Sequence, residues 1–317
     1  MPVVSTLEIL RDARSRKYGV GAYNVLSLDQ AAAIIRLSDK FKAPVLITEP
    51  AVLEKYVSFS DLGAIVREVA GRVSIPVGLH LSHGKDIATL KRCIAAGFTS
   101  VMIDGSVLPF GENVALTAEA VSLCHKNGVA CEGELGAVGS TSGEIKSVMT
   151  DPEEARKYVE ATGIDIFAVS IGNAHGFYKG VPKLDFERFK QIKAAMAHKS
   201  ELYYTLHGGT GISPEDLKKL ISEGCPKICI YTEMCGVGKE KAFDYLARTP
   251  EYHGTYDVPE LLRAITGGFL EVVEFDIETF GSADKSPLQQ GAQFVQGDTI
   301  NADLIKEIVN SVISRIK

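Results

Sequence analysis

Residues 100–133 read SVMIDGSVLPFGENVALTAEAVSLCHKNGVACEG and contain one complete strand–helix–strand unit. The run Ser100–Ile103 predicts a buried strand, Glu112–Asn127 has the apolar spacing of an amphipathic helix, and Val129–Gly133 predicts the next strand. Gly128 stands between helix and strand, where the end of a helix favours glycine. A helix that joins two short buried strands is typical of a parallel sheet.

The same unit repeats along the chain. The other predicted strands are Val20–Val25, Pro44–Thr48, Val77–Leu81, Ile166–Ser170, Tyr203–Leu206 and Ile228–Tyr231. The other predicted helices are Leu28–Phe41, Ser60–Gly71, Lys85–Ala96, Pro152–Thr162, Asp185–His198, Pro214–Glu223 and Val237–Ala247. Eight strands that alternate with eight helices predict an α/β fold, a closed (β/α)8 TIM barrel, with an open doubly wound sheet as the alternative.

Helix-capping residues and glycines between the predicted elements support these bounds. Glycines that follow a predicted helix and precede a strand recur at Gly97, Gly128, Gly163 and Gly224. Two helices begin with a capping residue followed by proline, at Asp151–Pro152 and Ser213–Pro214. Because no segment resembles a linker, we expect residues 1–317 to form one domain. Its C-terminal helical extension, residues 259–317, has helical patterns at Leu261–Thr279 and Ala302–Ile316.

Composition excludes several classes of protein. The 317 residues are 45% hydrophobic and 23% charged, as in soluble globular proteins, and the net charge of −6 argues against a nucleic-acid partner. No apolar run approaches the roughly 18 residues of a membrane span, and the charged segment Met1–Tyr18 does not resemble an export signal. The six cysteines include no CxxC pair, which favours a reducing cytoplasm.

In such a barrel, chemistry belongs to the loops that follow the carboxyl ends of the strands. The polar residues predicted there are Asn24, Glu49, Ser82, His83, Asp104, Glu132, Glu134, Asn173, His175, His207, Cys229, Thr232 and Glu233. Three of them, His83, His175 and His207, would present neutral imidazoles from separate strands, which is a ligand set for catalytic zinc. Asp104 and Glu134 could hold a second cation or orient the imidazoles. His80, inside its strand, is expected to pack or to support a ligand.

Two glycine-rich loops suggest a phosphate site. Gly172–Gly176 follows the sixth predicted strand, and Gly208–Gly211 follows the seventh and opens a helix. Such loops let backbone N–H groups face an anion, and a helix N-terminus favours negative charge. The last two strand loops are also the usual phosphate site of this barrel.

These residues resemble those of the class II, metal-dependent fructose- and tagatose-bisphosphate aldolases, from the N-terminus to about Lys285. The similar segments are His80–Gly84 (HLSHG), Ser100–Ser106 (SVMIDGS), Glu132–Gly136 (EGELG), Asp151–Ala155 (DPEEA), Ala174–Gly180 (AHGFYKG) and Leu206–Gly211 (LHGGTG).

The resemblance implies zinc, or another divalent ion, on His83, His175 and His207, and a second metal or a monovalent cation near Asp104 and Glu134. It also implies phosphate contacts from Gly176, Lys179, Gly208, Thr210 and Thr232, with Asn24 beside the substrate. In that family the metal is a Lewis acid for the enediolate formed when the C3–C4 bond of a ketose phosphate breaks.

The chain differs from the family at residues that take part in proton transfer during the reaction. Ser82 replaces an aspartate that exchanges a proton with the C4 hydroxyl, and Cys229 replaces an asparagine that supports the enediolate. The loop after the fifth strand keeps Glu144 alone in place of adjacent acidic residues. Glu49, where the family tends to place a hydroxyl, is a candidate replacement base. Ser82, Glu49, Cys229 and Glu144 are therefore the candidate catalytic residues.

Groups that would hold metal and phosphate are retained, while groups that would move protons have changed. The leading hypothesis is a zinc-dependent, aldolase-like lyase that acts on a phosphorylated ketose. A C4 epimerase that uses the same site and a non-catalytic sugar-phosphate-binding protein are the alternatives. The family also implies a homo-oligomer, a dimer or a tetramer.

Overall fold

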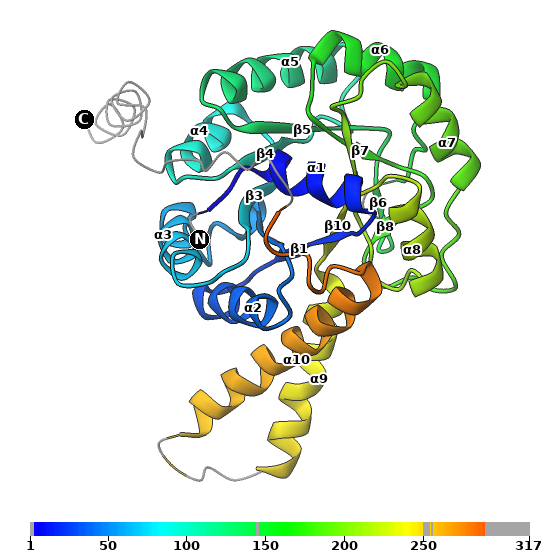
Figure 1. The fold of residues 1–317 in the computed structure, drawn as a ribbon. Helices are drawn as coiled ribbons and strands as arrows, with labels where there is room; N and C mark the ends of the chain where they lie inside the picture. Colours follow the sequence, from blue (N-terminus) through cyan, green and yellow to red (C-terminus); the bar gives the residue numbers. More distant parts are fainter. Residues whose placement is uncertain (1–2, 144–145, 250–253, 255, 289–317) are drawn as a thin grey trace.

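Eight parallel strands form a closed barrel at the centre of the computed structural model, which describes residues 3–143, 146–249, 254 and 256–288 (Figure 1). Around the barrel the strands follow the order β1-β10-β9-β7-β5-β4-β3-β2. Their bounds are β1 (Val20–Asn24), β2 (Val45–Pro50), β3 (Val77–Gly84), β4 (Ser100–Ile103), β5 (Ala130–Leu135), β7 (Ile166–Val169), β9 (Tyr203–Leu206) and β10 (Lys227–Ile230). The predicted (β/α)8 barrel is confirmed.

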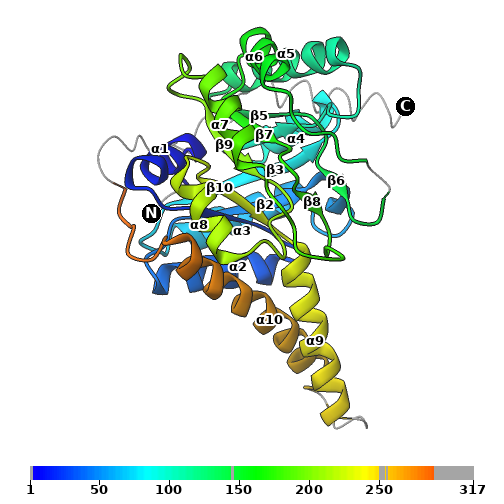
Figure 2. The ribbon, with the colours of Figure 1, turned by 90° about the vertical axis from the view of Figure 1, so that its right-hand side faces the viewer.

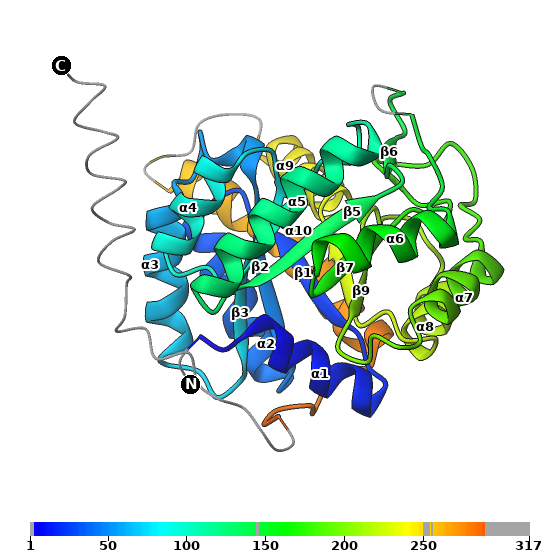
Figure 3. The same ribbon diagram turned by 90° about the horizontal axis from the view of Figure 1, so that it is seen from above.

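Helices cover the outside of the barrel (Figures 1 and 3). They are α2 (Leu28–Lys40), α3 (Phe59–Ala70), α4 (Ile87–Ala95), α5 (Phe110–Lys126), α6 (Pro152–Thr162), α7 (Phe186–Ala195), α8 (Pro214–Ser222), α9 (Thr232–Arg248) and α10 (Asp257–Phe280), with the 3-10 turn η1 (Ala51–Leu53) after β2. The predicted caps form, since Asp151 accepts from the first turn of α6 and Ser213 from that of α8. The four interelement glycines have positive φ, from 67° to 101°.

A helix that the sequence pattern did not predict, α1 (Thr6–Arg16), lies across the amino-terminal end of the barrel (Figure 1). Ile9 and Leu10 of α1 are fully buried in the interior cluster that also contains Leu46 and Ile166 from the strands. Thr6 reaches the interior hydroxyl of Ser100, 2.8 Å away. Because α1 closes this end, the polar side chains of the interior are open to ligands from the carboxyl end.

Two short strands add a second sheet at the carboxyl end of the barrel (Figure 2). In this sheet β6 (Gly139–Ser140), in the loop after β5, pairs with β8 (Ala174–His175), in the loop after β7. The N–H of Thr141 donates to the carbonyl of His175 at 2.8 Å, so the pairing continues one residue further. The loop that carries His175 is thereby fixed against a neighbouring loop.

Helices α9 and α10 pack against each other and project from the barrel as a hairpin (Figure 2). The predicted helix Leu261–Thr279 lies within α10, whereas the predicted helix Ala302–Ile316 falls outside the described residues. The end of α10 returns to the barrel, where Gly19 donates to the carbonyl of Phe280 at 2.8 Å. Among the helices of the described residues, none has the length and apolar character required to cross a membrane.

Candidate metal centre and active site

The structure brings the three predicted imidazoles together at the carboxyl end of the barrel. His83 lies near the end of β3, His175 in β8 and His207 directly after β9. Their ring centroids are 5.0 Å (His83–His175), 4.6 Å (His83–His207) and 6.0 Å (His175–His207) apart. One nitrogen from each ring lies within 4.8 Å of the others, which is close enough for all three to bind a single ion.

A local irregularity in β3 directs His83 into this cluster. The register with β4 shifts between Leu81 and Gly84, and His83 has a φ of 52°. That left-handed conformation is uncommon for a residue other than glycine, and residues so strained cluster at functional sites. A bulge of this kind re-aims a side chain at the end of a strand. Gly84 is required beside it, because a Cβ there would lie 2.6 Å from the carbonyl of Met102.

Each of the three imidazoles uses one ring nitrogen in a hydrogen bond to the protein. Nδ1 of His83 donates to Asp104 Oδ2 at 2.9 Å, and Nε2 of His207 donates to Glu132 Oε1 at 2.8 Å. The imidazole of His175 bonds to the backbone of Val138. The second nitrogen of each ring remains for a ligand, and buried Nε2 of His83 has no hydrogen-bond partner among the described residues. Partners that fix the tautomer in this way are typical of metal-binding histidines.

The protonation states also suit a cation. Burial and the neighbouring imidazoles of His83 and His207 lower the pKa of His175 to about 3, and burial lowers the pKa of His83. Burial acts against a charge on His207 too, but Cys229 and Glu132 outweigh it and raise the pKa of His207 to about 10. Two imidazoles are therefore neutral near pH 7. His207 keeps its Nε2 proton, which it shares with Glu132 in a hydrogen bond. Its Nδ1 proton would be lost to solvent when a cation binds there. The donor set fits a divalent ion that prefers nitrogen.

Glu132 is part of a buried polar row that crosses the barrel. Lys227 Nζ contacts Glu132 Oε2 at 2.5 Å and His80 Nε2 at 2.9 Å, and His80 Nδ1 lies 2.7 Å from Ser100 Oγ. Burial opposes a charge on Glu132, yet Lys227 and His80 hold the pKa of this carboxyl well below its usual range. Glu132 therefore stays ionised and accepts the hydrogen bond from His207 Nε2. His80 supports this row and takes no place in the imidazole trio.

Sequence reasoning did not assign a role to Lys227 or to Glu132. A signal was present, because Lys227 begins an otherwise apolar strand and alternates with Cys229, so both side chains face the interior. A fully buried lysine requires an acidic partner within reach. The partner could not be chosen from the pattern, since it comes from β5 on the other side of the barrel.

A second group of possible ligands adjoins the first. Ligand atoms of His83, Asp104 and Glu134 lie within 4.8 Å of one another. Glu134 Oε1 accepts from the N–H of Val138 at 2.9 Å, whereas buried Glu134 Oε2 has no partner among the residues described. Burial and the nearby Asp104 raise the pKa of Glu134 to about 8. The structure thus places both predicted carboxylates beside His83.

The glycine-rich loops form a rim next to the imidazoles. Gly208 has a φ of 65°, and a Cβ there would lie 2.3 Å from the carbonyl of Ala174, so the two loops touch through their backbones. Thr210 Oγ1 accepts from the N–H of Glu233 at 3.2 Å, next to Thr232, the first residue of α9. The rim therefore combines a tight backbone loop with the N-terminus of a long helix, which suits an anion.

The other predicted phosphate contacts flank this rim. Gly176, directly after His175, has a φ of 100°, and a Cβ at this position would lie 2.2 Å from Thr141 Oγ1. Lys179 lies further along the same loop with its side chain exposed. Gly176 is thus held by its neighbours, whereas Lys179 is open to solvent.

Ser82 and Cys229, two of the candidate proton-transfer residues, face the barrel interior. Ser82 is buried and shares a face of β3 with His80. The Cys229 sulfur lies 3.9 Å from His207 Nε2 and 3.6 Å from Thr205 Oγ1. Asn24 is also inside the barrel, where its Oδ1 accepts a hydrogen bond from the Thr48 hydroxyl. Glu144 falls outside the described residues.

Glu49 is not brought to the imidazoles. It follows Val45 and Ile47 on the face of β2 that packs against the helices, whereas Leu46 faces the interior. The ionisable groups that interact electrostatically with Glu49 are Cys93 of α4 and Glu54, and both lie outside the barrel. The alternation of the strand is the physical reason. Glu49 therefore does not face the site in which a replacement base would act.

The environment of Glu49 predicts a pH-dependent stability. Both carboxylate oxygens are buried without a partner among the described residues, and burial together with Glu54 raises the pKa of Glu49 to about 8. The neutral acid is therefore favoured in the folded state. Stability from this group is fully present below the unfolded value of about 4.3 and is lost as the pH rises towards 8.

Glu49→Gln should therefore stabilise the protein at pH 7 by about 3 kcal/mol, because an amide carries no charge to bury. At pH 5 the gain should be well under half of this. Free energies of unfolding measured in urea at both pH values test the expectation. Glu187→Gln is the control, since that carboxylate is exposed. An equal gain at both pH values would contradict it.

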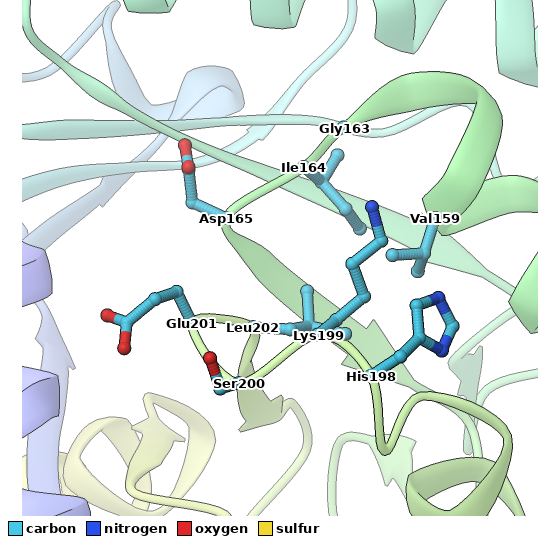
Figure 4. A pocket seen from close by; sticks show the side chains of 9 residues that line it. All are labelled: Val159, Gly163, Ile164, Asp165, His198, Lys199, Ser200, Glu201 and Leu202. Atoms are coloured by element: carbon cyan, nitrogen blue, oxygen red, sulfur yellow. The ribbon is translucent and has the colours of Figure 1, made fainter.

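A separate cavity of about 310 Å3 lies away from the imidazoles, near the amino-terminal ends of β7 and β9 (Figure 4). Val159 and residues 163–165 and 198–202 line it. It contains none of the imidazoles or carboxylates described above. The imidazole trio and the carboxylates beside it lie instead at the carboxyl end of the barrel.

Comparisons with known proteins find similarity along most of the chain. A family model described as "Fructose-bisphosphate aldolase class-II" matches residues 4–285. A fructose-bisphosphate aldolase from Staphylococcus aureus is 37% identical over 294 residues, which cover 90% of this chain and 100% of the relative. A probable fructose-bisphosphate aldolase from Bacillus subtilis is 37% identical over 292 residues, with the same coverage.

Solved structures share the fold. The YdjI aldolase from Escherichia coli K12 superposes with a TM-score of 0.77 at 31% identity, covering 89% of this chain and 99% of that one. A fructose-bisphosphate aldolase from Campylobacter jejuni superposes with a TM-score of 0.76 at 23% identity, covering 90% and 97%. The second comparison supports the barrel alone.

Proposed function

The chain belongs to the class II fructose-bisphosphate aldolase family, and from this premise we propose that it is a metal-dependent lyase that cleaves or forms the C3–C4 bond of a phosphorylated ketose. The observation that carries the proposal is the imidazole trio. His83, His175 and His207 each keep one nitrogen for a ligand and hold the other against the protein. We propose zinc as the ion, because three imidazoles with an open position suit it.

When bound, the cation supplies Lewis acidity at the oxygen atoms of the substrate. The residues of this chain orient the imidazoles that would hold this cation. Asp104 and Glu132 accept hydrogen bonds from His83 and His207 and so fix which nitrogen of each ring faces the site. The bulge at His83 and the β6–β8 pairing at His175 hold the rings in place.

The phosphate of the substrate would bind at the rim. Gly208 and Thr210 belong to the loop that follows His207, and Thr232 begins α9 beside it. Gly176 and Lys179 approach from the loop of His175. With the anion fixed at one side of the imidazoles, the carbon chain of the substrate would extend over Asn24 and Ser82, the interior residues of β1 and β3.

Ser82 is the observation that favours a second function. A serine hydroxyl is a poor base near pH 7, so removal of the C4 hydroxyl proton, which accompanies cleavage of the C3–C4 bond, needs another group. Retro-aldol cleavage, rotation of the carbonyl and re-addition would invert C4 without releasing either fragment. Cys229 beside His207 also changes the group that would support the enediolate. A ketose-phosphate 4-epimerase is therefore the second candidate.

One assay separates these functions. Zinc-loaded protein is incubated with a panel of ketose phosphates, and released triose phosphate is followed together with the stereochemistry at C4. The lyase releases triose, whereas the epimerase inverts C4 without release. Binding of the panel without either change would contradict both and leave a sugar-phosphate-binding protein. Protein depleted of metal is the control.

We also propose that the protein is a homo-oligomer, either a dimer or a tetramer. Support comes from the hairpin of α9 and α10, which projects from the barrel (Figure 2). On this hairpin the side chains of Phe243, Leu246 and Leu262 are 60%, 49% and 56% exposed. Apolar side chains gathered on a projecting element are typical of an interface. The occupant we propose is a second copy of this chain, and sedimentation equilibrium at micromolar concentration tests it.

A further inference from the structure

Asp104 already has a full set of hydrogen-bond donors. Its Oδ2 accepts from His83 Nδ1 at 2.9 Å and from Lys85 Nζ at 2.7 Å. Its Oδ1 accepts from Ser106, through the backbone N–H at 3.1 Å and the hydroxyl at 2.7 Å. An ionised carboxylate offers about four acceptor sites. Four donors therefore leave Asp104 without a lone pair for a metal ion.

The same carboxylate belongs to the second group of possible ligands, with His83 and Glu134. Glu134 Oε2 is buried without a partner among the described residues, so one ligand atom there is unused. The Asp104 side of the group differs. There His83 Nδ1 faces the carboxylate as a hydrogen-bond donor, and the ammonium of Lys85 lies 2.7 Å from Oδ2, in a position that a cation bound to Asp104 would use.

Lys85 reaches this position from outside. It follows Gly84 in the loop after β3, its side chain is 55% exposed, and its Nζ also lies 3.5 Å from the Asp104 carbonyl. The positive charge thus meets a carboxylate that is only 7% exposed. A divalent ion on Asp104 would have to displace the ammonium or tolerate a like charge beside it.

We propose that Lys85 takes the place of a second divalent cation, so that the chain binds one divalent ion, at the imidazole trio. The inference rests on the metal site in the proposed function. It also gives Lys85 a positioning role, because the ammonium holds the same carboxylate oxygen that accepts from His83. The second cation that the sequence resemblance implied near Asp104 and Glu134 does not fit this arrangement.

Counting metal ions tests the proposal without an activity assay. The native protein, Lys85→Met and Lys85→Arg are equilibrated with excess Co2+, desalted and analysed for cobalt per chain. We expect one ion in the native protein and in Lys85→Arg, which keeps the charge. In Lys85→Met, which keeps the apolar stem, we expect a second ion whose Kd is at least tenfold lower than that of any second ion in the native protein. Lys190→Met is the control. It removes an exposed ion pair with Glu187 and should still bind one ion.

Each outcome decides the question. Two ions in the native protein, or one ion in Lys85→Met, would overturn the role of Lys85. No ion in the native protein would instead remove the proposed metal site on which the inference rests. Circular dichroism confirms that each variant is folded, and the exposure of Lys85 gives no reason for loss of the fold.

Discussion

His175→Ala is expected to abolish tight binding of the divalent cation and to reduce turnover by about 10³-fold or more. Loss of one of three imidazoles should cost more than the 10–100-fold in affinity that follows loss of an outer partner. Lewis-acid stabilisation is worth several kcal/mol, and about 4 kcal/mol corresponds to that change in rate. Metal content after dialysis and turnover of the substrate found in the panel assay are the measurements.

His175 is the best of the three positions for this test. His207 donates to Glu132 and His83 to Asp104, so their removal would also take a hydrogen-bond donor from a buried carboxylate. The imidazole of His175 bonds to the backbone of Val138 and to no carboxylate among the contacts described, so its loss disturbs the fold least. His198→Ala is the matched control, because that imidazole is half exposed on the surface. Undiminished turnover of His175→Ala in metal-free buffer would contradict the whole site.

The barrel and the imidazole trio could be predicted because each depends on local pattern. Helix punctuation at Asp151 and Ser213 marks element starts, and once the strands are placed, the carboxyl ends of a parallel barrel must meet. His83, His175 and His207 follow three strands, so their proximity is a consequence of topology. The left-handed backbone of His83 could not be foreseen, since it depends on a shift in register with β4.

Features that depend on side-chain direction or on distant partners were not predictable. Glu49 stands at a strand end like the ligands, but a one-residue difference in alternation turns it towards the helices. Helix α1 was missed because the segment carries charges along most of its length and no strand precedes it. Its apolar side chains gain a partner only when the barrel closes. The donors that surround Asp104 come partly from Lys85, which the sequence pattern assigned to the start of a helix.

Lys227→Met is expected to lower the free energy of unfolding by about 3–5 kcal/mol. Lys227 is fully buried and contacts Glu132 and His80. Removal of one member of a buried ion pair leaves the other charge uncompensated, which costs about this much. Urea unfolding at pH 7 measures the change, and Lys190→Met, which removes an exposed lysine, should change it by less than about 1 kcal/mol. A similarly small change for Lys227→Met would show that the row does not require the charge.

A double variant separates the ion pair from the support of His207. Glu132→Gln alone leaves Lys227 buried without an anion, so it should also destabilise the protein. Lys227→Met with Glu132→Gln removes both charges, and because the partners touch, the loss should be well below the sum of the two single losses.

The same double variant also tests how Lys227 affects metal binding. Glutamine keeps a carbonyl oxygen that can accept the Nε2 proton of His207, so the orientation of that ring should survive the loss of both charges. Lys227→Met alone leaves a buried carboxylate that can relax away from His207 or take up a proton, and it should weaken Co2+ binding by about 10–100-fold. If the double variant recovers affinity along with stability, Lys227 serves the site by keeping Glu132 in place. Recovered stability with affinity still lost would mean that the negative charge of Glu132 itself strengthens the bond from His207 to the cation.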